Sequence, residues 1–245
     1  LLHGISSGAR LWAKQFASQV GRNRLIAWDA PGYGKSIALA SATPTAADYA
    51  RALKALVDEL GLTSFTLVGH SLGALMASAY ASLYPEDVSR LVLASVAQGY
   101  GLSPSEQQQQ VYEKRPRMLA ELGPEAMARE RGPFLLGQPT AENLSMVTHA
   151  MQRLTVAGFK ASSYLLAYDS ISYYLPAVRV NIEVLYGTDD GITPPAGMQT
   201  LQQRYAQMAL QAVPGAGHLL YVDQPGLFDG LVFAQTQVGQ KENNT

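Results

Sequence analysis

A serine in a distinctive setting stands near the middle of the chain, in the run FTLVGHSLG that spans Phe65–Gly73. The pattern is G-x-S-x-G, placed where an apolar run ends and a helical pattern begins. A sharp turn at this place lifts a serine hydroxyl above the edge of a sheet, and Gly69 and Gly73 keep neighbouring backbones from colliding. The free N–H groups of the helix that begins at Leu72 can stabilise an oxyanion. Ser71 is therefore the candidate nucleophile.

A second match to the same pattern, GISSG over Gly4–Gly8, is centred on Ser6. It follows directly on His3, and at most a short stub of strand, Leu1 and Leu2, stands before it. A nucleophile turn of this type needs a buried strand in front and a helix behind. We therefore favour Ser71, and Ser6 is kept as the alternative.

A serine nucleophile needs a base, and the chain offers four histidines, at positions 3, 70, 149 and 218. His218 lies in a Gly- and Pro-rich loop after the last expected strand, where α/β sheets place their ligands. His3 and His70 adjoin the two serine motifs, and a side chain next to the nucleophile at such a turn is expected to point away. His149 falls in a helical region and is expected to face solvent. His218 is the candidate base.

The residue that orients the base should be an acid between the serine and the histidine in chain order. The apolar run Ile182–Tyr186 leads into GTDDGITP, which contains two adjacent acids, Asp189 and Asp190. Either carboxylate could orient His218, while the other would satisfy backbone N–H groups in the loop. Spacing alone does not separate them.

Apolar runs and helical patterns alternate along most of the chain, which predicts a parallel sheet covered by helices on both faces. The expected strands are residues 24–28, 65–68, 90–94, 182–186 and 208–213, and the expected helices are 48–60, 72–84, 201–206 and 224–234. Residues 97–176 break the alternation, with no expected strand and with helical segments near 111–122, 124–136, 142–154 and 158–167. We assign 1–96 and 177–245 to an α/β core and 97–176 to a helical insertion. Residues 239–245 are polar and expected to fray.

The composition excludes several functions. The 245 residues are 47% hydrophobic and carry 18 basic and 19 acidic side chains, so a formal charge of −1 gives no electrostatic case for nucleic acid or an anionic membrane. There is no cysteine, which excludes disulfides, thiolate nucleophiles and cysteine metal sites. No apolar run reaches the roughly 18 residues of a membrane helix. We expect a cytoplasmic protein with a small-molecule substrate and no metal or cofactor, and a homodimer is left open.

Five blocks, in this order, resemble the α/β-hydrolase family: LLHG at Leu1–Gly4, DAPGYGKS at Asp29–Ser36, GHSLG at Gly69–Gly73, GTDDGITP at Gly187–Pro194, and Gly217–His218 followed by Asp223–Pro225. They are similar to that family's HG loop, its D-x-P-G-x-G-x-S loop, its nucleophile turn, its acid loop and its histidine segment. The resemblance selects Asp190 over Asp189. It implies an eight-stranded, mostly parallel sheet whose second strand is antiparallel. Two strands precede the HG loop in that family, and we expect this sequence to be a truncated form without them.

The resemblance also implies a mechanism. Ser71 would attack an acyl carbonyl, His218 would transfer the proton, and Asp190 would hold the histidine tautomer. Backbone N–H groups of Ile5 and Leu72 would form the oxyanion hole. Relatives that open epoxides or displace halide carry aspartate at the nucleophile position, so serine predicts attack on a carbonyl.

The insertion then becomes a cap over Ser71, loosely similar to the caps of enol-lactonases and of C–C hydrolases of ring-cleavage pathways. We expect a serine hydrolase for a moderately hydrophobic ester, lactone or enol-lactone. Two alternatives are kept: hydrolysis of a C–C bond in a ring-cleavage product, and a small-molecule receptor on the same fold that does not turn over its ligand.

Overall fold

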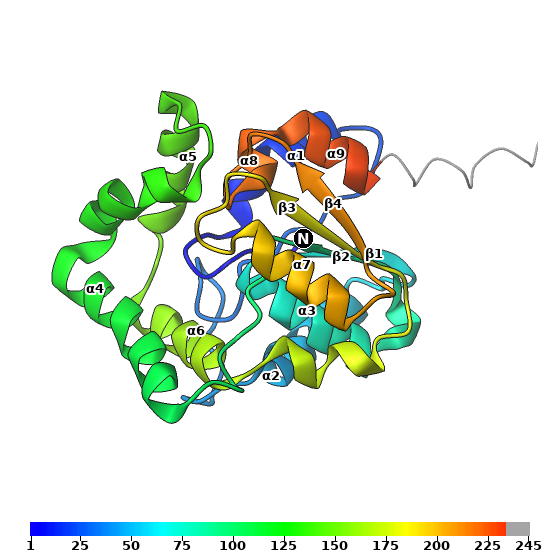
Figure 1. The fold of residues 1–245 in the computed structure, drawn as a ribbon, viewed down its shortest axis with the longest axis horizontal. Helices are drawn as coiled ribbons and strands as arrows, with labels where there is room; N and C mark the ends of the chain where they lie inside the picture. Colours follow the sequence, from blue (N-terminus) through cyan, green and yellow to red (C-terminus); the bar gives the residue numbers. More distant parts are fainter. Residues whose placement is uncertain (234–245) are drawn as a thin grey trace, which may run out of the picture.

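A parallel sheet lies at the centre of the computed structural model, which describes residues 1–233 (Figure 1). Its four strands lie side by side in chain order: β1 (Phe65–His70), β2 (Val88–Ala94), β3 (Ile182–Gly187) and β4 (Ala209–Val213). Every neighbouring pair is parallel. The four corresponding predictions from the sequence are confirmed, each within two residues at either end. The polar end at 239–245 lies outside the described residues.

The first residues of the chain extend this sheet beyond β1. Leu2 forms a parallel bridge with Gly69: its N–H donates to Val68 O at 2.8 Å, and its carbonyl accepts from His70 N at 2.9 Å. Residues 24–28 run next to Leu1, which donates to Ile26 O at 2.7 Å and accepts from Trp28 N at 3.4 Å. The expected strand at 24–28 was wrong, because these bonds to a single residue are too short a ladder to form a strand.

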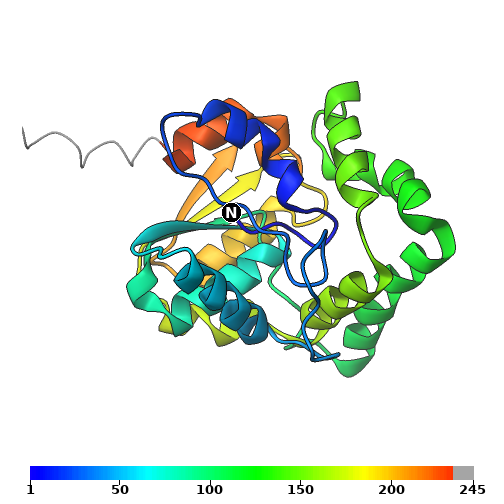
Figure 2. The same cartoon turned by 180° about the vertical axis from the view of Figure 1, so that it is seen from behind.

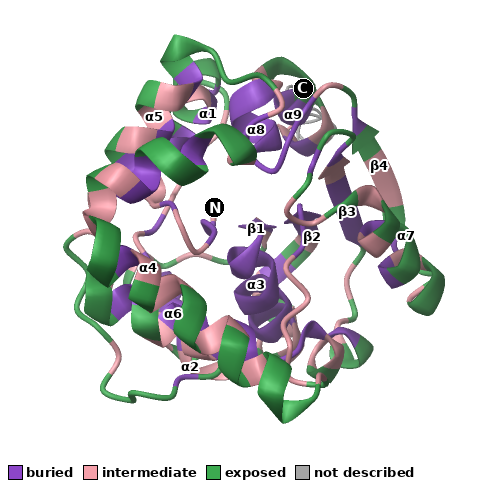
Figure 3. Cartoon of the chain, turned by 60° about the vertical axis from the view of Figure 1, so that its left-hand side comes forward, coloured by how far each residue is buried: buried purple, intermediate pink, exposed green. Residues whose placement is uncertain are grey.

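Helices cover both faces of the sheet (Figures 1 and 2). On one face lie α2 (Ala46–Glu59), α3 (Leu72–Leu83) and α7 (Pro195–Arg204), and on the other α1 (Ala13–Ser18), α8 (Leu220–Asp223) and α9 (Pro225–Phe233). A short 3₁₀ turn at Ala9–Trp12 leads into α1, and another follows α3 at Pro85–Asp87. Helix α3 is made of apolar and small residues all round and is buried from Leu72 to Ala81 (Figure 3), as a helix packed beneath a sheet must be.

Between β2 and β3 the chain forms only helices: α4 (Ser105–Arg131), α5 (Ala141–Met151) and α6 (Val156–Tyr168), with 3₁₀ turns at Gly132–Leu135, Ile171–Tyr173 and Leu175–Ala177. They stand to one side of the sheet, toward which β3 and β4 point (Figure 1). Helix α4 begins six residues before the expected start, and it contains the segment expected near 111–122 and the segment expected near 124–136 as far as Arg131. The rest of that second segment forms the 3₁₀ turn Gly132–Leu135. The helix is broken where the two segments meet, at Gly123 with φ 75°, just before Pro124. None of the helices within residues 1–233 is long and apolar enough to span a membrane.

An ion pair joins β2, β3 and α9. The Arg90 guanidinium makes two parallel bonds of 2.6 Å to the two oxygens of Glu183, and the side chains are each 12% exposed. The same guanidinium donates to the carbonyls of Val232 at 2.6 Å and Leu231 at 2.9 Å. Bidentate pairs of this kind are the strong ones, and the bonds to α9 fix that helix against the sheet.

We expect Arg90→Met to lower the free energy of unfolding by about 2–4 kcal/mol, because it leaves the Glu183 carboxylate largely buried without its cation and with only the Gln211 amide as a donor, at 3.5 Å. The double variant Arg90→Met with Glu183→Leu should lose less than the single variant, since it removes both charges. Urea unfolding followed by circular dichroism measures both. A double variant less stable than Arg90→Met would contradict this account of the pair.

Candidate active site

The backbone at Ser71 is held in a strained conformation between β1 and α3. Its φ is 53° and its ψ is −115°, a region that residues with a side chain rarely adopt. Close packing fixes this turn: a Cβ on Gly69 would lie 2.4 Å from Gly73 O, and one on Gly73 would lie 2.6 Å from Leu2 O. The Ser71 N–H donates to Ala94 O at 2.8 Å. Glycine is thus required at both positions because a side chain would collide with neighbouring backbone, as expected from the sequence.

His218 and Asp190 meet at 3.0 Å, between the Nδ1 of the ring and Oδ2 of the carboxylate. They are 5% and 2% exposed. The other aspartate oxygen accepts from the N–H groups of Ile192 at 2.8 Å and Thr193 at 2.9 Å, and the Thr193 hydroxyl donates to Oδ2 at 2.7 Å. Asp189 is exposed and receives a hydrogen bond from the side chain of its neighbour Thr188. Of the two acids, Asp190 is therefore the one next to the histidine.

The surroundings of Asp190 hold it in the charged form. Burial raises the pKa of the carboxyl, but the hydrogen bond and charge of His218 and the two donors of Thr193 outweigh burial, so the pKa lies well below its usual range. A permanent carboxylate facing Nδ1 selects the histidine tautomer with its proton on that nitrogen. Nε2 of His218 is then free to accept a proton.

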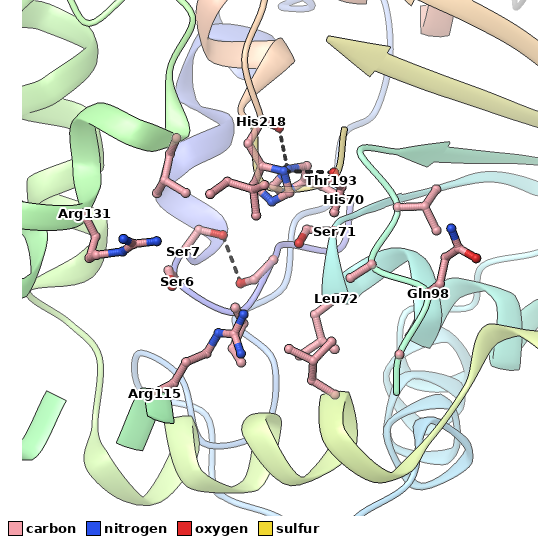
Figure 4. A pocket seen from close by; sticks show the side chains of 18 of the residues that line it. Ser6, Ser7, His70, Ser71, Leu72, Gln98, Arg115, Arg131, Thr193 and His218 are labelled. Carbon is pink, nitrogen blue, oxygen red and sulfur yellow. Dashed lines mark hydrogen bonds between the residues drawn. The ribbon is translucent and has the colours of Figure 1, made fainter. Parts of the chain in front are cut away.

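Ser71 and His218 line the same cavity (Figure 4). Ser71 is 5% exposed, and within residues 1–233 no hydrogen bond joins its hydroxyl to His218. Hydrogen bonds between a nucleophile and its base are often long without substrate and tighten when substrate binds. Ser6 also lines the cavity, but it lies in a turn at residues 5–6 rather than between a strand and a helix.

His70 does not point away from the site, as its position next to Ser71 suggested. Its ring centroid lies 4.8 Å from that of His218, and its Nε2–H donates to the His218 carbonyl at 2.9 Å. Burial, followed by the charge of His218, lowers the pKa of His70 well below its usual value, so the ring is neutral. On another side, the Tyr221 ring meets it edge-on at 5.0 Å. His70 therefore supports the backbone of His218. His149 is exposed, as expected.

The HG loop fixes the direction of the Ile5 N–H. The carbonyl of Gly4 accepts from three donors: Nδ1 of His3 at 2.8 Å, the Ser7 hydroxyl at 3.0 Å and the Ser7 N–H at 3.3 Å. In a trans peptide the N–H points opposite to the carbonyl, so the Ile5 N–H points away from these donors. The Ile5 carbonyl is held in turn by the Tyr33 hydroxyl at 2.7 Å. Gly4 adjoins the nucleophile, since a Cβ there would lie 3.0 Å from that of Ser71.

The loop at Asp29–Ser36 anchors the HG loop. The N–H of Ala30 donates to Nε2 of His3 at 3.0 Å, which leaves the proton of that ring on Nδ1, where it bonds to the Gly4 carbonyl. Asp29 accepts from Ala9 N at 2.9 Å, and its carbonyl accepts from the Ser36 hydroxyl at 2.6 Å. The motif DAPGYGKS thus acts on the site through His3.

Asp223, for which we predicted no role from the sequence, joins the histidine loop to the helical insertion. Its carboxylate accepts from the N–H groups of Gly217 at 2.9 Å, Gly137 at 2.8 Å and Gln138 at 3.1 Å. Next to it, the Leu219 N–H donates to the carbonyl of Leu135 at 2.9 Å. The only signal in the sequence is the block DQP that follows His218.

The cavity has a volume of about 400 Å³ and lies between the carboxyl ends of the strands and the insertion. Four of the five predicted site residues line this cavity: Ser71, His218, Ile5 and Leu72, all from the core. The fifth, Asp190, lies behind His218 and is bonded to it. The insertion supplies apolar side chains, namely Met118, Met127, Leu135, Phe159 and Leu166, and three cations, namely Lys114, Arg115 and Arg131. A carbonyl carbon next to Ser71 would lie among the candidate nucleophile, the candidate base and the two backbone amides predicted to form the oxyanion hole.

The low pKa of Asp190 predicts a pH dependence of stability. A carboxyl whose pKa is lowered by folding adds stability above its unfolded pKa of about 4, and this is lost as the pH falls. Between pH 6 and pH 3, roughly, the free energy of unfolding should therefore fall more steeply for the wild type than for Asp190→Asn. Urea titrations across that range measure it. Asp189→Asn, which removes an exposed carboxylate, is the control and should follow the wild type. Parallel curves for Asp190→Asn and wild type would contradict the assignment.

Comparisons with known proteins show the family and the fold of the chain. Residues 1–225 match the family described as the alpha/beta hydrolase fold. The human (lyso)-N-acylphosphatidylethanolamine lipase is 26% identical over 263 residues, covering 95% of this chain and 77% of its own. A 2-hydroxy-6-oxononadienedioate/2-hydroxy-6-oxononatrienedioate hydrolase of Paraburkholderia phymatum is 40% identical over 97 residues, which is 38% of this chain and 34% of its own. An esterase from Thermogutta terrifontis has a similar fold, with a TM-score of 0.84 at 24% identity over 96% of this chain and 87% of its own. The expected fold is confirmed, and the chain belongs to the α/β-hydrolase fold family of enzymes.

Proposed function

We propose that the protein is a serine hydrolase that cleaves a carboxylic ester or lactone of a small, moderately hydrophobic substrate. The observation that carries the proposal is the buried His218–Asp190 pair at 3.0 Å, placed in one cavity with a serine whose backbone is strained. Strained backbone is characteristic of functional sites, and a carboxylate–histidine pair next to a serine is the arrangement that activates a hydroxyl.

In the first half of the reaction, Ser71 Oγ attacks the carbonyl carbon while its proton passes to Nε2 of His218. The imidazolium that forms is stabilised through Nδ1–H by Asp190. The negative oxygen of the tetrahedral intermediate is held by the N–H groups of Leu72 and Ile5, each worth about 3–4 kcal/mol in the transition state. When the intermediate collapses, the ester C–O bond breaks and the alcohol leaves with the proton from His218.

In the second half, water attacks the acyl group on Ser71. His218 takes a proton from this water and returns it to Ser71 Oγ as the acyl–enzyme bond breaks, which releases the carboxylic acid and restores the enzyme. We propose that residues 97–176 act as a cap that closes over these steps, since their apolar side chains complete the cavity. The names of the human lipase and of the Thermogutta esterase support an ester as the substrate.

Hydrolysis of a C–C bond is the second candidate, favoured by the partial likeness to a hydrolase named for an oxononadienedioate. The same residues would serve, because Ser71 or an activated water would again attack a carbonyl. The leaving group would then be a carbon, which must be protonated at carbon rather than at oxygen. The products separate the two candidates.

Labelling with a fluorophosphonate followed by peptide mapping tests the proposal. We expect a single labelled serine, Ser71, in the wild type and in Ser6→Ala, and no label in Ser71→Ala. Hydrolysis of p-nitrophenyl esters should fall by at least about 1,000-fold in Ser71→Ala and by a similar factor in His218→Ala.

Three outcomes would overturn all or part of this proposal. Label on Ser6 would mean that the other serine is the nucleophile. No label on a folded protein that still binds a small acyl compound would favour the receptor. Labelling of Ser71 with cleavage of a dienedioate ring-cleavage product, but no cleavage of esters or lactones, would favour the C–C hydrolase.

A further inference from the structure

The cavity next to Ser71 is strongly biased in charge. Among its lining residues are three cations, Lys114, Arg115 and Arg131, and no aspartate or glutamate. The chain as a whole is close to neutral, with a formal charge of −1, so the bias does not reflect a basic protein. All three cations come from one helix of the insertion, α4.

Arg115 has no hydrogen-bond or ion-pair partner within residues 1–233, although the Tyr100 and Tyr33 side chains interact with its charge. It is partly buried, and neither a hydrogen bond nor an ion pair reaches its guanidinium from that part of the chain. Arg90 offers a contrast. Its guanidinium is also largely buried, but it is paired with Glu183 and with two backbone carbonyls. Burial and, to a smaller extent, the charge of Arg131 lower the pKa of Arg115. An unpaired guanidinium in such a place is unfavourable until an anion reaches it.

The break in α4 turns two arginines toward one cavity. Arg115 precedes Gly123 and Arg131 follows it, and the positive φ of that glycine bends the helix between them. Figure 4 shows both side chains extending from the insertion toward the part of the cavity formed by the loop of Ser6 and Ser7, with Ser71 between them and Gln98. Arg131 also lies over the Phe134 ring, at 5.5 Å, which limits the directions it can take.

We propose that the substrate carries a carboxylate in addition to the carbonyl that is attacked, and that Arg115, assisted by Arg131, binds this carboxylate. The inference rests on the proposed function and specifies its substrate class. The guanidinium fork matches a carboxylate with two parallel bonds. The Met118, Met127 and Phe159 side chains suit a short hydrocarbon segment between the two groups. Arg115 is thus a residue that determines specificity.

The test compares two esters that differ only at the far end of the acyl chain: mono-p-nitrophenyl glutarate, which ends in a carboxylate, and p-nitrophenyl pentanoate, which ends in a methyl group. We expect wild type to have a kcat/KM at least about 10-fold higher for the glutarate ester. Arg115→Met should lower that value about 30-fold and change the pentanoate value by less than about 3-fold. Arg115→Lys should restore part of the preference.

The matched control is Arg117→Met, which removes an exposed arginine of the same helix that does not line the cavity. It should leave both esters unaffected. Equal hydrolysis of the two esters by wild type, or an equal effect of Arg115→Met on both, would overturn the inference while leaving the hydrolase intact.

A second measurement keeps the inference testable if hydrolysis fails. Calorimetric titration of Ser71→Ala with glutarate should show binding that is weakened about 10-fold or more when Arg115→Met is added. Loss of ester hydrolysis together with Arg115-dependent glutarate binding would refute the proposed function alone. Glutarate binding that does not change with Arg115, or tighter binding of inorganic phosphate than of glutarate, would refute the carboxylate site.

Discussion

The strained turn at Ser71 is the constraint on which the rest of the site depends. A non-glycine residue at φ 53° and ψ −115° costs about 1–3 kcal/mol, so the turn persists only where its surroundings leave no other choice. Here the backbone of Leu2 and His3 lies against Gly73 so closely that a Cβ would overlap it. The first residues of the chain thus hold the candidate nucleophile in place as well as supplying the HG loop.

Two histidines outside the proposed catalytic triad hold backbone carbonyls of the candidate site. His3 turns the Gly4 carbonyl, and with it the Ile5 amide, while His70 holds the carbonyl of His218. Both are buried, and burial lowers the pKa of each. A neutral ring can donate from one nitrogen and accept at the other, as His3 does, whereas a charged ring could only donate. Their burial therefore keeps both rings neutral, and their hydrogen bonds set which nitrogen carries the proton.

The candidate site residues were predicted from local pattern, and their catalytic roles stay predictions. Ser71 was predicted from its turn, His218 by elimination and from its loop, and Asp190 only with the family resemblance, since spacing left Asp189 equally eligible. The structure separates these two because Asp190 is enclosed by Thr193 and His218. The orientation of His70 and the lack of a strand at 24–28 could not be predicted from the sequence, since each depends on a residue distant in the chain. The place of Arg115 in the cavity was not predicted for the same reason, because Ser6 and Ser71, which line the cavity with it, are distant in the chain.

The hydrogen bonds from the histidine loop to the insertion have a kinetic consequence. Asp223 joins Gly217 to Gly137 and Gln138, and Leu219 bonds directly to Leu135, so the residues on both sides of His218 are attached to segment 135–138. Any displacement of that segment that lets a substrate in or a product out must break these bonds or carry the histidine with it. Access to the cavity and the position of His218, the candidate base, are then coupled, so that a displacement that opens the cavity also moves the candidate base out of line with Ser71.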